Sequence, residues 1–377
     1  MEKSISIIIY MSCFAISLIF CKIYERYCIQ RNYMELPWHK KLIWFLFIIS
    51  GPVFISAIRY DVGTDYFAYI NWFNNINSLP IDMVIQKFGN EPLYLILNKV
   101  AFILFKEPWG IFFLSSLLIH IFIIYGIDFF KEHLSMPMAL FIYYMLHFNF
   151  GLNGIRQMIA ISIVFYSLKF IYQRRPFKYG FFIVIATMFH NTALISILFY
   201  IIISYKYRGG SDNFIRKFFY SSVIVLSPII VLLGLKILIK VPIFSQYEVY
   251  INSDFALGTG FLIDIIPIII PVFIFRKQIE KKHRLLSYFI DLSLLNIPFR
   301  VSAYFIQWGS RLALYTNIFY YILPAILINS VNRKSNRRLI KLYYILYFIL
   351  YYFINFVTVY NRHEVYPYKI LTSFLLN

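Results

Sequence analysis

The sequence predicts an all-α protein that crosses a membrane many times. Of its 377 residues, 60% are hydrophobic and only 14% are charged, a balance outside the range of ordinary soluble domains. Apolar runs recur from end to end, and no long polar stretch divides them. Backbone that spans lipid must satisfy its own hydrogen bonds, so these runs are expected to be helices. We therefore expect a single integral membrane domain over residues 1–377, with about 11–13 membrane segments, some broken or re-entrant.

Hydropathy places the expected spans along the chain. They cover residues 4–21, 41–58, 92–105, 109–127, 136–150, 155–172, 179–203, 214–239, 260–275, 285–306, 311–331 and 339–358. A helix needs about 20 apolar residues to cross a bilayer, so the third and fifth of these are short. The first run lacks a small-residue cleavage site, and we expect it to remain as a helix rather than to be removed as a signal peptide.

The basic residues lie between the spans and predict an orientation. The connections 22–41, 173–178, 206–217, 276–284 and 333–341 carry net charges of +3, +3, +3, +4 and +5, which is +18 of the formal +19. Because short basic loops stay on the cytoplasmic side, all five are expected to face the cytoplasm.

The acidic connection 59–91 is expected on the opposite side. It has two basic and four acidic residues, includes an amphipathic stretch, and should face outward, as should a second loop at 240–260. If every span crossed the membrane in alternation, the basic connection 173–178 would face outward instead of toward the cytoplasm. One short segment upstream is therefore expected to enter the membrane and return without crossing.

The apolar run 179–203 is flanked by basic loops and interrupted by "FHNTA", which contains His190 and Asn191. We interpret it as two short helices that meet at an outward tip, since irregular backbone is tolerated where protein or a water-filled cavity covers it. The alternative is one long tilted helix with a buried histidine.

The stretch "RYDVGTDYFAYINWF" (59–73) leaves a span and begins an amphipathic segment. Gly63 permits a turn, and Asp65 is a suitable N-cap for the following helix. Asp61 and Asp65 are either a carboxylate pair or part of a capped surface helix. A metal site is the weaker interpretation, because no histidine or third carboxylate follows at close spacing.

The segment "NGIRQ" puts polar groups at the start of a span. Asn153, Arg156 and Gln157 have i, i+3 and i+4 spacing, which places them on one face of a helix start. A helix N-terminus with a guanidinium group suits a phosphate. The alternative is an arginine that extends its head group to the membrane interface.

Three further motifs carry polar groups at outward ends of spans. In "FHNTALI", His190 is either a proton-transfer group or a packed histidine. In "WGSRLALY", Arg311 and Tyr315 have i, i+4 spacing on the first turn of a helix. In "NEPLY", Glu91 precedes Pro92, which is typical of a helix start. With the predicted orientation, all of these groups converge near the outer leaflet.

Taken together, the motifs resemble the EpsG family of Wzy-type polysaccharide polymerases, which are related to the O-antigen polymerases. The resemblance rests on Arg59, Gly63, Asp65, Tyr69, Glu91, Pro92, Asn153, Arg156, Gln157, Ala160, Ala186, His190, Arg311 and Tyr315. Each block is weak alone, whereas their order and separation over most of the chain are fairly specific.

This resemblance implies a GT-C-like glycosyltransferase in the bacterial cytoplasmic membrane, with an active site that faces the periplasm or outside. It would transfer a growing glycan from undecaprenyl diphosphate to the sugar end of another undecaprenyl-diphosphate-linked repeat unit. The product would be an O-antigen, a capsule or an exopolysaccharide. The family implies no metal and no cofactor; its partners would be the lipid-linked oligosaccharide, membrane lipid, and a chain-length regulator and flippase of the pathway. The absence of Rossmann and P-loop glycine patterns agrees with this, and no nucleic-acid partner is expected.

We expect an inverting transfer in which arginines stabilise the leaving diphosphate and a base accepts the hydroxyl proton. The arginines would be Arg156, Arg311 and Arg59, in that order. The base would be His190, with Asp65 as the second candidate. The supporting residues would be Asn153, Gln157, Tyr69, Glu91 and Tyr315.

Two other classes of function remain open. A lipid-linked saccharide flippase or other transporter would show paired, repeat-related broken helices, and none is evident in the sequence. A membrane O-acyltransferase would use His190 as a base and would need a path for an acyl donor.

Overall fold

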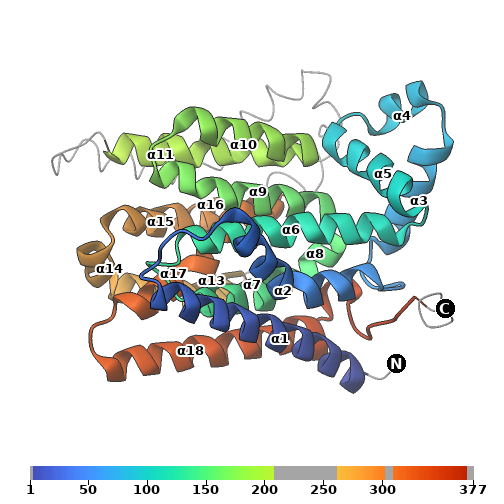
Figure 1. Ribbon diagram of the computed structural model, residues 1–377. Helices are drawn as coiled ribbons and strands as arrows, with labels where there is room; N and C mark the ends of the chain where they lie inside the picture. Colours follow the sequence, from blue (N-terminus) through green and yellow to red (C-terminus); the bar gives the residue numbers. More distant parts are fainter. Residues whose placement is uncertain (1–2, 208–260, 302–308, 372–377) are drawn as a thin grey trace.

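The computed structural model describes residues 3–207, 261–301 and 309–371, and these form an all-α bundle (Figure 1). Six of the described helices are long and apolar enough to cross a membrane. Within the described ranges, extended pairing is limited to one isolated β-bridge between Arg59 and Ile370. The predicted class, an all-α polytopic membrane protein, is confirmed.

The first half of the chain forms helices that agree closely with the hydropathy spans. They are α1 (Lys3–Gln30), α2 (Trp38–Ala57), α3 (Tyr66–Ser78), α4 (Ile81–Phe88), α5 (Pro92–Phe105), α6 (Trp109–Phe129), α7 (Met136–Tyr143), the π-helical η1 (Tyr144–Phe148), α8 (Asn149–Asn153), α9 (Ile155–Tyr172), α10 (Pro176–Phe189), the 3₁₀ segment η2 (Asn191–Ser196) and α11 (Ile197–Tyr207). Proline begins both α5 and α10, where its missing N–H has no helical partner to lose.

The second half continues in the same way. Its segments are α13 (Phe261–Ile274), α14 (Arg276–Lys282), α15 (Arg284–Leu294), α16 (Asn296–Val301), the 3₁₀ segment η5 (Gly309–Tyr315), α17 (Ile318–Ser330), α18 (Lys334–Tyr352), the π-helical η6 (Phe353–Thr358) and the short η7 (Arg362–Glu364). The predicted span 214–239 and the predicted outward loop 240–260 lie outside the described residues.

Burial separates central from peripheral helices. Helices α9 and α17 are largely enclosed by their neighbours, whereas α1 and α18 are mostly exposed. The exposed faces of α1 and α18 are apolar, as shown by Ile8, Ile19, Leu346 and Leu350. Apolar surface of this extent suits contact with lipid rather than with water.

The basic connections gather at one end of the bundle, as the charge pattern predicts. Lys41 pairs with Asp128 at the end of α6, with Nζ and Oδ2 2.7 Å apart. The rings of His133 and His283 lie 4.6 Å apart, and Tyr172 at the end of α9 contacts His133. Lys282 donates to the Asn329 carbonyl, next to the 333–341 connection. Four of the five basic connections therefore share one end; most of 206–217 is outside the described residues.

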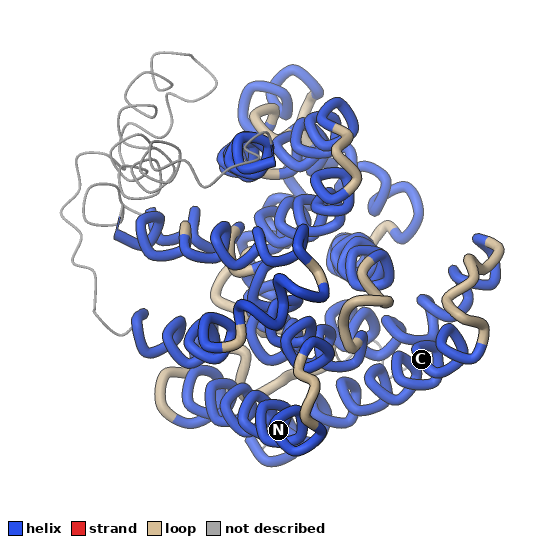
Figure 2. The backbone as a smooth tube through the Cα atoms, turned by 90° about the vertical axis from the view of Figure 1, so that its left-hand side faces the viewer, coloured by secondary structure: helices blue, strands red, loops and turns tan. Residues whose placement is uncertain are grey.

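The opposite end holds α3, α4 and both ends of the described chain (Figure 1). Figure 2, turned so that the basic end of Figure 1 faces the viewer, shows the helices side by side around the central ones. Helix α5 lies wholly at the α3/α4 end, which we call the acidic end. Glu91 before it contacts Arg156 at the start of α9, and Phe112 shortly after it packs on Arg59, which follows α2. The residues on both sides of α5 therefore lie at the acidic end, and whether α5 is the short segment expected to return without crossing stays a prediction.

The apolar run 179–203 is broken at His190. This residue has extended backbone angles (φ −158°, ψ 116°) between α10 and η2. The hydroxyl of Tyr179 donates to the Ser196 carbonyl at 2.5 Å, which satisfies a backbone group near the break. Two short helices that meet at a tip are confirmed, and the single tilted helix is wrong.

The first testable prediction concerns orientation. We expect a cysteine introduced at Asp82 to react with a membrane-impermeant maleimide from outside the cell, and a cysteine at Lys281 to react after permeabilisation. Both side chains are exposed, at opposite ends of the bundle. Short basic loops stay on the cytoplasmic side, which gives the direction. The measurement is labelling of intact and permeabilised cells, in a background that lacks Cys13, Cys21 and Cys28. Labelling at position 281 in intact cells would contradict the orientation.

Candidate active site

Glu91 joins three separate segments at the acidic end. It occupies the N-cap position of α5, and only 7% of its surface is exposed. One carboxylate oxygen accepts a hydrogen bond from Nη1 of Arg156, on the first turn of α9. The other lies 2.6 Å from Nδ1 of His190, at the break after α10. Carboxylate, guanidinium and imidazole thus form one buried cluster, the Glu91 triad.

The Glu91 triad fixes the ionisation of its carboxyl group. Burial raises the pKa of Glu91, but the hydrogen bond and charge of His190 and the charge of Arg156 outweigh burial and hold the pKa below its ordinary value. Glu91 is therefore a carboxylate at neutral pH. The charged imidazolium and the neutral ring can both donate Nδ1–H to this carboxylate, and the neutral ring then keeps its lone pair on Nε2. In the neutral form, Nε2 is therefore the acceptor atom of the His190 ring.

Arg156 is held from two directions. Its guanidinium carbon lies 4.1 Å from the centre of the Trp72 ring, and its side chain remains 30% exposed. Within the described part of the chain, its hydrogen bond to Glu91 uses Nη1 alone. The other guanidinium nitrogens are available to an anion from the exposed side. A cation stacked on an aromatic face and bound to a carboxylate has a fixed direction, which suits a positioned donor.

The structure corrects the prediction that Asn153, Arg156 and Gln157 share one helix face. Gly154 has non-helical angles (φ −86°, ψ 55°) and separates α8 from α9. The Asn153 oxygen accepts from Thr64 Oγ1 and from the Asp65 backbone N–H, both at 2.8 Å. Gln157 instead donates to the Arg311 carbonyl at 3.0 Å. The helical spacing fails because the glycine turns the chain before the helix begins.

Three residues of the 59–73 stretch, Tyr69, Asp65 and Asp61, differ in the contacts that their side chains make. Tyr69 accepts a hydrogen bond from the Ile155 backbone N–H at 3.0 Å and so caps the start of α9. Asp65 stands at the N-cap position of α3, but its side chain makes no capping hydrogen bond. Asp61 forms an ion pair with Lys369. His190 thus belongs to the Glu91 triad, whereas Asp65 is a half-buried carboxylate at the start of α3.

The motif "WGSRLALY" also folds differently from the prediction. Residues Gly309–Tyr315 form a 3₁₀ segment, in which i and i+4 do not share a face. Arg311 is exposed, whereas Tyr315 is fully buried with its hydroxyl 3.0 Å from Thr192 Oγ1. Tyr315 therefore ties η5 to η2, next to His190, whereas the Arg311 side chain is exposed.

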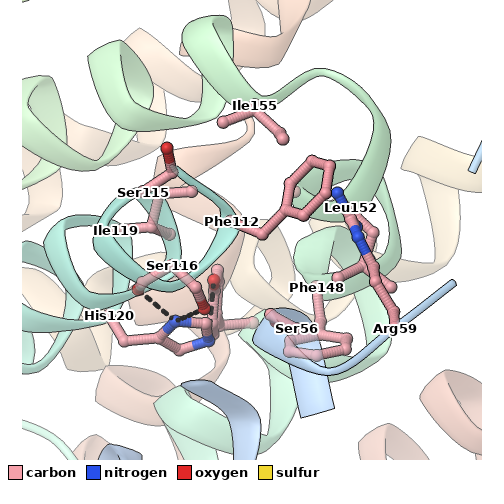
Figure 3. Close-up of a pocket in the computed structure, with 12 residues that line it drawn as sticks. Ser56, Arg59, Phe112, Ser115, Ser116, Ile119, His120, Phe148, Leu152 and Ile155 are labelled. Carbon is pink, nitrogen blue, oxygen red and sulfur yellow. Dashed lines mark hydrogen bonds between the residues drawn. The ribbon is translucent and has the colours of Figure 1, made fainter. Parts of the chain in front are cut away.

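Arg59 lies in a separate pocket (Figure 3). Its side chain is 1% exposed, and its guanidinium carbon lies 4.5 Å from the Phe112 ring centre. Its Nε and Nη1 atoms have no hydrogen-bond partner among the described residues. The pocket, which Ser115 and His120 also line, has room for about one water molecule. A diphosphate does not fit there, so we leave Arg59 out of the proposed phosphate-binding set.

The sequence interpretation missed three groups at the acidic end. Arg300, Arg362 and His363 come from α16 and from the turn after η6. Arg300 Nε donates to Asn296 Oδ1 at 2.9 Å, and Asn296 in turn binds the Ala313 carbonyl of η5. The available signal was the polar run "NRHE" directly after the last apolar span. Within the described ranges, no group of three His, Cys, Asp or Glu residues could hold a metal ion.

The fold and the triad define a class: a multi-pass membrane protein with a buried, charged cluster at one end of its bundle. The family comparison is more specific. The chain belongs to the EpsG family, whose model matches residues 42–370, and this family is associated with polysaccharide polymerases. The family resemblance of the sequence motifs is thereby confirmed. A search of curated proteins and a search of solved structures each find no match.

Proposed function

We propose that this protein polymerises lipid-linked polysaccharide repeat units on the outer face of the bacterial cytoplasmic membrane. The substrate would be an undecaprenyl-diphosphate-linked oligosaccharide, and the protein would act beside the flippase and the chain-length regulator of its pathway. Family membership supports polymerisation of polysaccharide. The single observation that carries the chemistry is the Glu91 triad, in which one carboxylate orients an imidazole and a guanidinium.

The proposed reaction is an inverting glycosyl transfer. A hydroxyl oxygen of the acceptor sugar attacks the anomeric carbon of the donor glycan, and the bond from that carbon to the diphosphate oxygen breaks. The hydroxyl proton passes to Nε2 of His190, and Glu91 stabilises the imidazolium that forms. The electron pair leaves with the diphosphate, which remains on its lipid.

Arg156 and Arg311 would stabilise the charge that develops on the leaving diphosphate. Gln157, one residue after Arg156, holds the Arg311 carbonyl, so η5 and the first turn of α9 are adjacent. Donors placed where charge develops favour the transition state over the ground state. In this proposal the triad supplies the base and the two arginines supply the electrophilic assistance.

The second testable prediction is the fate of the substrate in a strain without the gene. We expect single repeat units on the lipid carrier at the outer face and no long chains, because transport precedes the step that would be lost. Mass spectrometry of lipid-linked glycans, with an impermeant glycosidase to report the leaflet, measures this. A plasmid-borne copy should restore the long chains. Accumulation of single units on the cytoplasmic face would favour the transporter function instead.

A further inference from the structure

A second polar cluster lies at the acidic end, built around the turn 361–364. The backbone N–H groups of Gly63 and Thr64 donate to the carbonyls of Glu364 and His363, at 3.3 and 3.1 Å. Asn361, His363 and Glu364 all have positive φ (39°, 68° and 51°). Three non-glycine residues in this region are strained, and such strain persists where surrounding contacts fix the chain. The turn is therefore held in one conformation against the 61–65 loop.

The hydrogen bonds of Asn153 determine which nitrogen of His363 carries a proton. The Asn153 oxygen already accepts from Thr64 and from the Asp65 backbone, which fixes the amide orientation. Its Nδ2 group, a donor, then faces Nδ1 of His363 at 3.3 Å. Nδ1 must accept, so the neutral ring carries its proton on Nε2. His363 is thus a hydrogen-bond donor toward any group that approaches its other side.

The surroundings of His363 are strongly positive. Burial, together with the charges of Arg362 and Arg311, lowers the pKa of His363 to about 4. Arg362 Nη1 lies 3.6 Å from Asp264 Oδ2, and the Arg362 side chain is 43% exposed. Arg300 also interacts electrostatically with the Asp264 carboxylate. Two guanidinium groups, those of Arg362 and Arg300, thus interact with one carboxylate, and the charge of Arg311 acts on His363, so the cluster favours an added anion.

We propose that Arg362 and the Nε2–H group of His363, with Arg311 beside them, form a second phosphate-binding subsite. Its ligand would be a diphosphate on a prenyl lipid. This identity rests on the proposed function, because polymerisation brings two lipid-linked diphosphates to one site. Arg156 faces one of them from the Glu91 triad, and the cluster at the turn 361–364 binds the other. Arg311 is connected with both groups, since Gln157 holds its backbone at the first turn of α9 and its charge acts on His363.

The third testable prediction is measured by binding and needs no polymerase activity. The full chain in phosphatidylcholine nanodiscs is titrated with farnesyl diphosphate by isothermal calorimetry. We expect two molecules per protein, and Arg362→Gln should weaken one of them about tenfold, the effect of losing one charge-assisted hydrogen bond. Lys369→Gln is the matched control: it removes one positive charge at the same end, from the ion pair with Asp61. Equal binding by Arg362→Gln and Lys369→Gln would overturn the subsite.

Asp264→Asn separates ligand binding from a structural role of Arg362. If the subsite binds phosphate, removal of the competing carboxylate should strengthen farnesyl diphosphate binding, opposite in sign to Arg362→Gln. If Arg362 serves only to pair with Asp264, both variants should weaken binding alike, and the proposal would fail. Arg362→Lys keeps the charge and should bind between wild type and Arg362→Gln.

Competition experiments identify which part of farnesyl diphosphate the subsite recognises. Inorganic pyrophosphate should displace farnesyl diphosphate, whereas farnesol should not. Phosphatidylglycerol in the nanodisc could instead displace farnesyl diphosphate while pyrophosphate does not. That result would overturn the diphosphate as the ligand and indicate the head group of a bulk lipid. A protein that binds two diphosphates but forms no polymer in the gene-replacement strain would contradict the proposed function and leave the subsite standing. If the strain forms polymer but Arg362→Gln binds farnesyl diphosphate as tightly as the wild type does, the subsite would be contradicted and the proposed function would stand.

Discussion

Replacement of His190 by Ala is expected to lower the rate of polymerisation by about 10²–10⁴-fold, the usual contribution of a positioned general base. The structure gives a physical reason, because the Glu91 carboxylate lies 2.6 Å from Nδ1 and directs the Nε2 lone pair away from it. Alanine removes the proton acceptor but keeps the break between α10 and η2, which depends on backbone angles. The measurement is the rate of glycan-ladder growth in membranes matched for protein amount.

Two further variants test whether the lower rate of His190→Ala is specific to this histidine and depends on Glu91. His39→Ala removes an exposed histidine at the basic end and should leave the ladder unchanged. If His190 acts through Glu91, the double variant His190→Ala/Glu91→Gln should lose little more than His190→Ala alone, since groups that act as a unit are not additive. A nearly full-length ladder from His190→Ala would move the role of base to Asp65, the half-buried carboxylate at the start of α3.

Arg156→Lys is expected to lower the rate about a hundredfold, which corresponds to about 3 kcal/mol for one donor to developing charge. Arginine uses one nitrogen for Glu91, stacks its plane on Trp72 and still has donors for an oxyanion. Lysine keeps the charge but has a single, compact ammonium group, which cannot make these contacts together. Chain-length distribution and initial rate, at equal protein level and insertion, measure the effect.

Arg333→Lys is the matched control for this substitution. Arg333 is exposed at the basic end of the bundle, and the exchange there should have no effect on chain length. Wild-type chain lengths from Arg156→Lys would show that Arg156 only extends to the membrane interface, where lysine reaches equally well. That result would leave Arg311 and Arg362 as the cationic groups for both diphosphates, with His363 as a neutral hydrogen-bond donor.

The sequence alone determined the helices and the two ends of the bundle. Hydropathy located most of the described spans to within a few residues, although α1 continues to Gln30, because each lipid-exposed segment must satisfy its own backbone and cover it with apolar side chains. The break at His190 and the start of α5 at Pro92 were also local properties. The clustering of positive charge in five connections predicted which connections share one end of the bundle, since charged loops do not cross lipid readily.

Only the tertiary structure decided which polar groups meet. The hydrogen bonds from Arg156 and His190 to Glu91 connect residues 65 and 99 positions apart, and no local pattern encodes such a contact. Gly154 turns the chain so that Asn153 faces the 61–65 loop instead of the arginine beside it. The segment after the last span, which had no evident role in the sequence, reaches Asn153 through His363. Helical spacing predicts which residues are neighbours within one segment. The partner of a buried charge is determined instead by how helices that are distant in the sequence pack together.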